Sequence, residues 1–209
     1  MTGRFISFEG GEGAGKTTQI KRLAERLRGE GQDVVLTREP GGTPGAEAIR
    51  ELLVTGETGR WNGRTEALLM NAARADHVAR LILPALGEGK WVLCDRFGHS
   101  TLAYQGVARG MDLEELLALH NIATEGLWPA KTLLFDLPVR AGLARAGVRG
   151  GTEARFEGEA LAFHEKVRAG FLALAKQDKC MTVIDAERDA DAVAAHVWRV
   201  IEPMLRPLP

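Results

Sequence analysis

The sequence contains Gly10-Gly11-Glu12-Gly13-Ala14-Gly15-Lys16-Thr17, which matches the pattern G-x-x-x-x-G-K-[ST]. The match lies between an apolar run, 5–8, and a segment, 20–27, in which apolar residues recur at helical spacing. Glycines let successive backbone N–H groups face phosphate oxygens, and the following helix adds the positive end of its dipole. We therefore expect ATP or GTP to bind residues 10–17 and Thr18, with Lys16 reaching the β- and γ-phosphates and the Thr17 hydroxyl binding Mg²⁺.

Outside this loop, short apolar runs alternate with helical patterns. The runs that predict buried strands are 5–8, 34–36, 91–93, 133–135 and a fifth around 181–184. Helical patterns are predicted at 20–27, 65–86, 116–119 behind a capping pair of Asp112 and Glu115, 159–176 and 191–204. This alternation predicts an α/β fold, a parallel sheet of about five strands covered on both faces, in a single domain over residues 1–209.

Composition excludes several classes of protein. The chain has 209 residues, 45% hydrophobic and 26% charged, which is typical of a folded globular protein. A net charge of -1 argues against a general nucleic-acid binder. Cys94 and Cys180 lie in or beside apolar runs, no hydrophobic leader precedes the first strand, and no apolar stretch is long enough to span a bilayer. We expect a cytoplasmic protein with no membrane partner.

Further motifs follow one another in order along most of the chain. They are Phe8-Glu9-Gly10, Thr37-Arg38-Glu39-Pro40-Gly41-Gly42-Thr43, Ala72-Ala73-Arg74, Asp95-Arg96 and Ser100-Thr101-Leu102-Ala103-Tyr104-Gln105-Gly106. In order and spacing they resemble the thymidylate kinase family. The resemblance implies a P-loop NTPase fold of three α/β/α layers, and transfer of the γ-phosphoryl group of MgATP to dTMP for dTTP synthesis. It also implies a homodimer.

Phosphoryl transfer requires cations, because like charges about 4 Å apart repel by about 4 kcal/mol per unit pair near a protein surface. Arg96 follows Asp95 at the end of a predicted strand, where parallel-sheet enzymes bind ligands, and we expect it to hold the acceptor phosphate. The resemblance gives Arg38 a similar role and Asp95 a water-mediated contact with Mg²⁺. It assigns Glu12 to the 3′-hydroxyl of dTMP. The acceptor phosphate is already ionised, so a general base is unnecessary.

The predicted pocket for the base lies along the helix that carries Arg74. Met70 is four residues earlier, so both side chains project from one face of that helix. The resemblance implies that Arg74 bonds the thymine ring, and it implies an aromatic residue at position 70, where this chain has methionine. It places Tyr104 against the 2′ carbon of the sugar and Gln105 near the base. Pro40 and Ser100 complete the acceptor site that the resemblance implies.

The segment 138–157 interleaves glycines with arginines, which predicts a mobile arginine-bearing flap, or simply a solvated loop when composition is considered alone. The resemblance implies a catalytic arginine either in the phosphate loop, where this chain has Gly13, or in this lid. We expect Arg149 to stabilise the transition state, with Arg145 and Arg155 as closing or adenine-side contacts, and we count Arg145 among the residues that bind ATP. The expected catalytic set is Lys16, Arg96, Arg149 and Glu12.

Two other functions fit the phosphate loop. One is a kinase of the same architecture with a different nucleoside monophosphate or a deoxynucleoside as acceptor, against which Arg74 and the pair Tyr104-Gln105 argue. The other is a P-loop ATPase that works as a switch, although such proteins usually carry a second lysine early in the loop, where this chain has Gly10-Gly11-Glu12.

Overall fold

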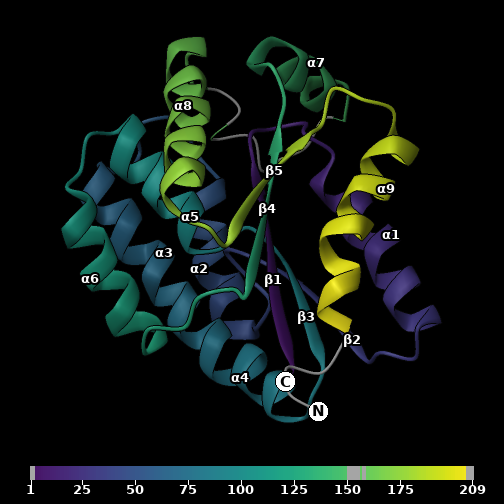
Figure 1. Ribbon diagram of the computed structural model, residues 1–209. Coiled ribbons are helices and arrows are strands. Elements are labelled where there is room, and N and C mark those ends of the chain that lie inside the picture. The colour runs from purple at the N-terminus through teal and green to yellow at the C-terminus, as the bar shows by residue number, and fades with distance from the viewer. Residues whose placement is uncertain (1–2, 150–155, 157–158, 206–209) are drawn as a thin grey trace.

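The computed structural model describes residues 3–149, 156 and 159–205, and only the backbone of residues 148 and 149 (Figure 1). In this part of the chain, five parallel strands form one sheet in the order β2-β3-β1-β4-β5. Their bounds are β1 Arg4–Gly10, β2 Val34–Arg38, β3 Trp91–Asp95, β4 Lys131–Asp136 and β5 Met181–Asp185. The predicted parallel sheet is confirmed, and each strand includes its predicted apolar run.

Helices connect the strands and cover both faces of the sheet. The helical elements are α1 Lys16–Gly29, α2 Pro44–Val54, α3 Gly63–His77, the π-helical turn Val78–Ile82, α4 Leu83–Gly87, α5 Gly98–Thr101, the π-helical turn Leu102–Ala108, α6 Leu113–Thr124, α7 Val139–Arg149, α8 Leu161–Gln177, α9 Ala190–Ile201 and the 3₁₀ turn Glu202–Leu205. Helices α1 and α9 lie together on one side of the sheet, and α3, α4, α6 and α8 lie on the other (Figure 1). The predicted helices are all present, with ends shifted by a few residues.

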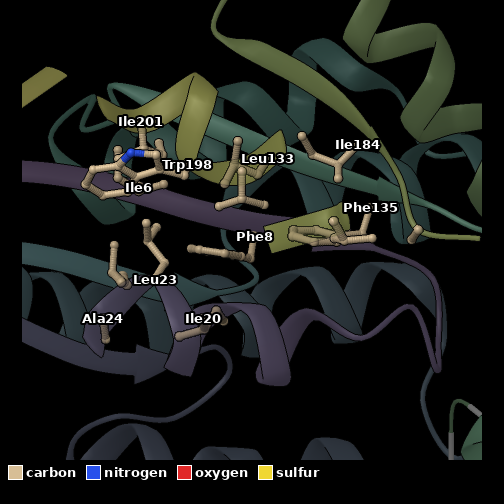
Figure 2. Close-up of a cluster of buried hydrophobic side chains, with 14 of the residues drawn as sticks. Ile6, Phe8, Ile20, Leu23, Ala24, Leu133, Phe135, Ile184, Trp198 and Ile201 are labelled. Carbon is tan, nitrogen blue, oxygen red and sulfur yellow. The ribbon is translucent and has the colours of Figure 1, made fainter. Parts of the chain in front are cut away.

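Alternate residues of each strand supply the two cores. Ile6 and Phe8 of β1 pack with Leu133 and Phe135 of β4 under α1 and α9 (Figure 2). On the other face, Phe5 packs with residues of β3 and of the π-helical turn after α3, and with α4. Because successive side chains in a strand point to opposite faces, this arrangement requires strands that are apolar throughout. That requirement explains why continuous apolar runs predicted the strands.

Two parts of the fold differ from the sequence analysis. The glycine- and arginine-rich segment was expected to be a loop, but Val139–Arg149 forms helix α7. Its Ala146 is buried and its half-buried Ala141 packs against the core that lies under α1 and α9, and this burial offsets the low helix propensity of Gly142 and Gly147. Helix α2 was not predicted at all, although Thr43 caps it and Pro44 is its first residue.

Candidate active site

The candidate site lies where β1 and β3 end side by side. Gly10 ends β1 and leads into the phosphate loop, while Asp95 ends β3, and the backbone N–H of Arg96 donates to the Phe8 carbonyl at 2.9 Å. Gly13 and Gly15 have φ angles of 65° and 83°, a left-handed conformation that glycine adopts without steric cost. These turns carry the chain from β1 into α1, whose first residue is Lys16. The predicted strand-loop-helix arrangement of the phosphate loop is confirmed.

Lys16 is buried within its own loop. Its ammonium donates to the carbonyls of Gly10 at 3.2 Å and Gly11 at 2.9 Å. Burial, followed by the nearby charge of Arg96, lowers the pKa of Lys16. A phosphate at the loop would supply the negative charge that this buried ammonium needs.

Thr17 and Asp95 meet across the start of α1. The Thr17 hydroxyl donates to the Asp95 carboxylate at 3.0 Å. In the described part of the chain, no cluster of three or more histidine, cysteine or acidic side chains could hold a metal by itself. A hydroxyl and one carboxylate fit Mg²⁺ that arrives with nucleotide phosphates, because Mg²⁺ prefers oxygen ligands and keeps several waters.

Glu12 is the centre of a charged cluster in the loop. Its Oε1 accepts from Arg96 Nη2 at 2.7 Å and from the Tyr104 hydroxyl at 3.0 Å. Burial acts to raise the pKa of Glu12, but the charges of Arg96 and Lys16, together with the Tyr104 hydroxyl, lower it to about 2. The carboxylate is therefore ionised at neutral pH, and it holds Arg96 beside the loop.

Glu9 supports this cluster from inside the sheet, and the sequence analysis gave it no role of its own. Its carboxylate accepts from the backbone N–H of Phe97 at 2.8 Å and from the Ser100 hydroxyl at 2.6 Å. Both donors belong to the segment that follows Arg96. Glu9 thus ties the end of β1 to the turn that presents Arg96.

A cavity of about 130 Å³ opens next to the loop, and we call it the arginine cavity. Its lining residues are Glu12, Glu39, Pro40, Arg50, Val54, Met70, Arg74, Arg96, Phe97, Ser100, Thr101, Tyr104, Gln105 and Phe156. All the predicted acceptor-site residues except Arg38 are among them. Arg38 lies outside the cavity and forms a salt bridge with Glu47 at 3.0 Å, about half of its side chain being exposed.

Arg74 is almost fully buried at 2% exposure and is held from three directions. It donates to the Glu39 carboxylate at 2.8 Å, to the Asn71 side chain at 3.1 Å and to the Thr101 hydroxyl at 3.1 Å. His77 contacts the other oxygen of Glu39 at 3.1 Å. The guanidinium is therefore fixed at the wall of the cavity.

A second hollow, of about 380 Å³, lies on the other side of the phosphate loop, and we call it the loop groove. Gly15, Thr18, Gln19 and Arg145 line it together with residues 186–190, which follow β5. Sequence reasoning missed 186–190, although the carboxyl end of a parallel strand is the signal that could have found them. The side chain of Arg149, and all of Arg155, lie outside the described residues.

A phosphate loop between a strand and a helix, beside a cavity lined by the buried Arg74 and the partly buried Arg96, is typical of a P-loop kinase. The model of the thymidylate kinase family matches residues 8–197. The chain belongs to the thymidylate kinase family.

Individual relatives agree with this assignment. A thymidylate kinase of Caulobacter vibrioides is 56% identical over 201 residues, which cover 95% of this chain and 96% of that protein. One from Magnetococcus marinus is 52% identical over 203 residues and 97% of each chain. The crystal structure of thymidylate kinase from Ehrlichia chaffeensis superposes with a TM-score of 0.78 at 32% identity, covering 96% of this chain and 100% of that chain. The fold, the loop and the kinase class expected from the sequence are confirmed.

Proposed function

We propose that the protein transfers the γ-phosphoryl group of MgATP to dTMP, giving ADP and dTDP. The observation that carries this proposal is that Glu12 belongs both to the phosphate loop and to the arginine cavity. A donor phosphate on the loop and an acceptor phosphate at Arg96 would then meet beside one ionised carboxylate. Residues 1–209 would work as one kinase domain that supplies dTDP for dTTP synthesis.

On the donor side, residues 10–17 and Thr18 bind the phosphates of ATP, and Lys16 reaches the β- and γ-phosphates. Thr17 holds Mg²⁺ directly and Asp95 through water, an assignment supported by their hydrogen bond at 3.0 Å. Bound Mg²⁺ neutralises charge on the transferred phosphoryl group. Arg145 contacts the nucleotide from the loop groove, and Arg149 and Arg155 are the other lid arginines.

On the acceptor side, Arg96 holds the phosphate of dTMP, and Arg38 would reach the phosphate from the end of β2 by leaving its salt bridge with Glu47. Glu12 accepts from the 3′-hydroxyl of the sugar, and Tyr104 crowds the 2′ carbon, which favours deoxyribose. The remaining residues of the expected dTMP site contact the base, the sugar or the walls: Pro40, Met70, Arg74, Ser100 and Gln105.

The arginines promote phosphoryl transfer through their position and charge, because this reaction needs little covalent chemistry from the protein. The pairing of Arg96 with Glu12 keeps the guanidinium in the cavity. Since the pKa of Glu12 is about 2, this pairing is present throughout the neutral range.

The expected homodimer is supported by apolar side chains on one side of the molecule, where α2, α3 and α6 lie (Figure 1). Leu52 of α2, Leu68 of α3 and Leu117 of α6 are exposed by 41%, 52% and 38%. Leu68→Lys should shift sedimentation from dimer to monomer, while Leu83→Lys, an exposed leucine of α4, should not. A monomeric wild type, or a dimer that survives Leu68→Lys, would contradict this interface.

The helices and the cysteines bear on where the protein is located. No helix in the described residues is long and apolar enough to cross a membrane. Cys94 and Cys180 are free thiols, which is compatible with the cytoplasmic location expected from the sequence.

The activity is tested by measuring ADP release from MgATP with dTMP, dUMP, dCMP, dGMP or AMP, and without acceptor. Release that depends on dTMP supports the proposal, and loss of that release in Arg96→Ala with ATP binding retained supports the acceptor role of Arg96. Preference for another monophosphate would move the proposal to a different nucleotide. Release without any acceptor would replace the kinase by an ATPase.

A further inference from the structure

Helix α7 touches the phosphate loop through two glycines. A Cβ atom added at Gly142 would overlap the carbonyl oxygen of Glu12, and one added at Gly13 would overlap the carbonyl oxygen of Gly142. The contact is thus between backbones, from both sides. Gly10 of β1 and Phe135 of β4 are partners in register. Strand β1 then leads into the phosphate loop and β4 into α7, so the sheet brings these two segments together.

The other described glycine of α7 provides a comparison. A Cβ atom at Gly147 would meet no atom of the described residues within 4 Å. Glycine is among the weakest helix formers, so a contact that leaves no room for a side chain can explain a glycine inside a helix. Gly142 has such a contact with the loop, and Gly147 has none that the described residues show.

Arg145 connects this contact with the nucleotide site. It lies three residues after Gly142, so the two positions share one face of the helix. Its guanidinium donates to the Ala186 carbonyl at 3.4 Å and lines the loop groove with Gly15 and Thr18. The distance between α7 and the loop therefore sets where Arg145 stands relative to a bound nucleotide.

We propose that Gly142 is a positioning residue that seats α7 directly on the phosphate loop and so places Arg145 at the loop groove. The proposal rests on the proposed function and adds a residue to it. It also gives a physical reason why the expected catalytic arginine would lie either in the phosphate loop or in the lid. A side chain at position 13 could not share this space with α7, so an arginine there and a lid seated in this way exclude each other.

Two matched variants test the proposal, Gly142→Ala and Gly147→Ala. Both replace glycine by alanine in one helix and raise its helix propensity equally, but only the first introduces a methyl group into the loop contact. Moving α7 by about 1 Å would misplace Arg145 enough to lower kcat/KM for ATP by about 10- to 100-fold. We expect this loss in Gly142→Ala, with a smaller change in KM for dTMP, and wild-type kinetics within about two-fold in Gly147→Ala.

The outcomes separate the possible failures. If wild type phosphorylates dTMP and Gly142→Ala matches Gly147→Ala in kcat and in KM for ATP, the positioning role is wrong. If wild type does not phosphorylate dTMP, the proposed function fails instead.

If Gly142→Ala does not fold, hydrogen exchange of the wild-type protein tests the positioning role instead. Adding MgADP should protect amides of 139–147 together with those of the phosphate loop. Protection of the loop alone would overturn the proposal.

Discussion

Glu9 should make the stability of the protein fall as pH rises through the weakly acidic range. Its side chain is fully buried at the end of β1. Burial raises the pKa of Glu9 from 4.5 to about 7, although the Ser100 hydroxyl, the charge of Arg96 and the Phe97 N–H act to lower it. The folded state therefore binds a proton that the unfolded state releases at lower pH.

The sign and size of the effect follow from this difference. Stability from the protonated carboxyl is fully present below pH 4.5 and is lost as pH rises to about 7. The difference of 7 − 4.5 = 2.5 pH units corresponds to about 3 kcal/mol at about 1.4 kcal/mol per unit. Glu9→Gln should remove this contribution to the slope, because glutamine stays neutral and keeps an oxygen for the Phe97 N–H.

Urea unfolding at several values between pH 5 and pH 8 measures the slope directly. The free energy of unfolding of Glu9→Gln minus that of wild type should rise over this range by up to about 1.4 kcal/mol per pH unit. Glu25→Gln, which changes an exposed carboxylate of α1, serves as the control. If the wild-type and Glu9→Gln curves run parallel, the reasoning about the buried carboxyl is refuted.

Three substitutions test the substrate sites. Met70→Phe should lower KM for dTMP several-fold, because an aromatic ring stacks on a base more strongly than a thioether, and an unchanged KM with intact fold would remove Met70 from base recognition. Glu39→Gln loosens Arg74 and should raise KM for dTMP about tenfold without changing KM for ATP; equal changes in both values would contradict a role at the base. Arg149→Ala should lower kcat by on the order of 10³, and activity within a few-fold of wild type would remove it from the catalytic set.

The strands could be predicted because both faces of the sheet are covered. Strands of such a sheet are apolar on both faces, and the run 91–93, for example, supplies both cores. Helix α7 could not be predicted in the same way. Gly142 and Gly147 weaken its helical signal, and what stabilises it is packing against elements that are distant in sequence.

Site residues at or directly after the end of a strand could be predicted from the sequence. Contacts with partners that are distant in sequence could not. Asp95 ends β3, and Arg96 and the phosphate loop directly follow strand ends, so the edge of the sheet brings them together. Two partners of Arg74, Glu39 and Thr101, are 35 and 27 positions away, and only the tertiary fold brings them to α3. Glu9 directly follows the predicted run 5–8, in the Phe8-Glu9-Gly10 motif, and nothing near it in the sequence points to its hydrogen-bond donors at Phe97 and Ser100.

The turn at Arg96 joins the two halves of the site. Arg96 has a φ of 70°, a left-handed conformation that costs a residue with a side chain about 1 to 2 kcal/mol. This turn directs Asp95 to the Thr17 hydroxyl and Arg96 to Glu12, so neighbouring residues face the loop and the cavity respectively. Glycine would relax the backbone here but would bring no guanidinium. The unfavourable backbone conformation belongs to Arg96, the expected phosphate arginine, and the expected magnesium carboxylate Asp95 directly precedes it. We infer that the strain is retained because one strand end then serves both substrates.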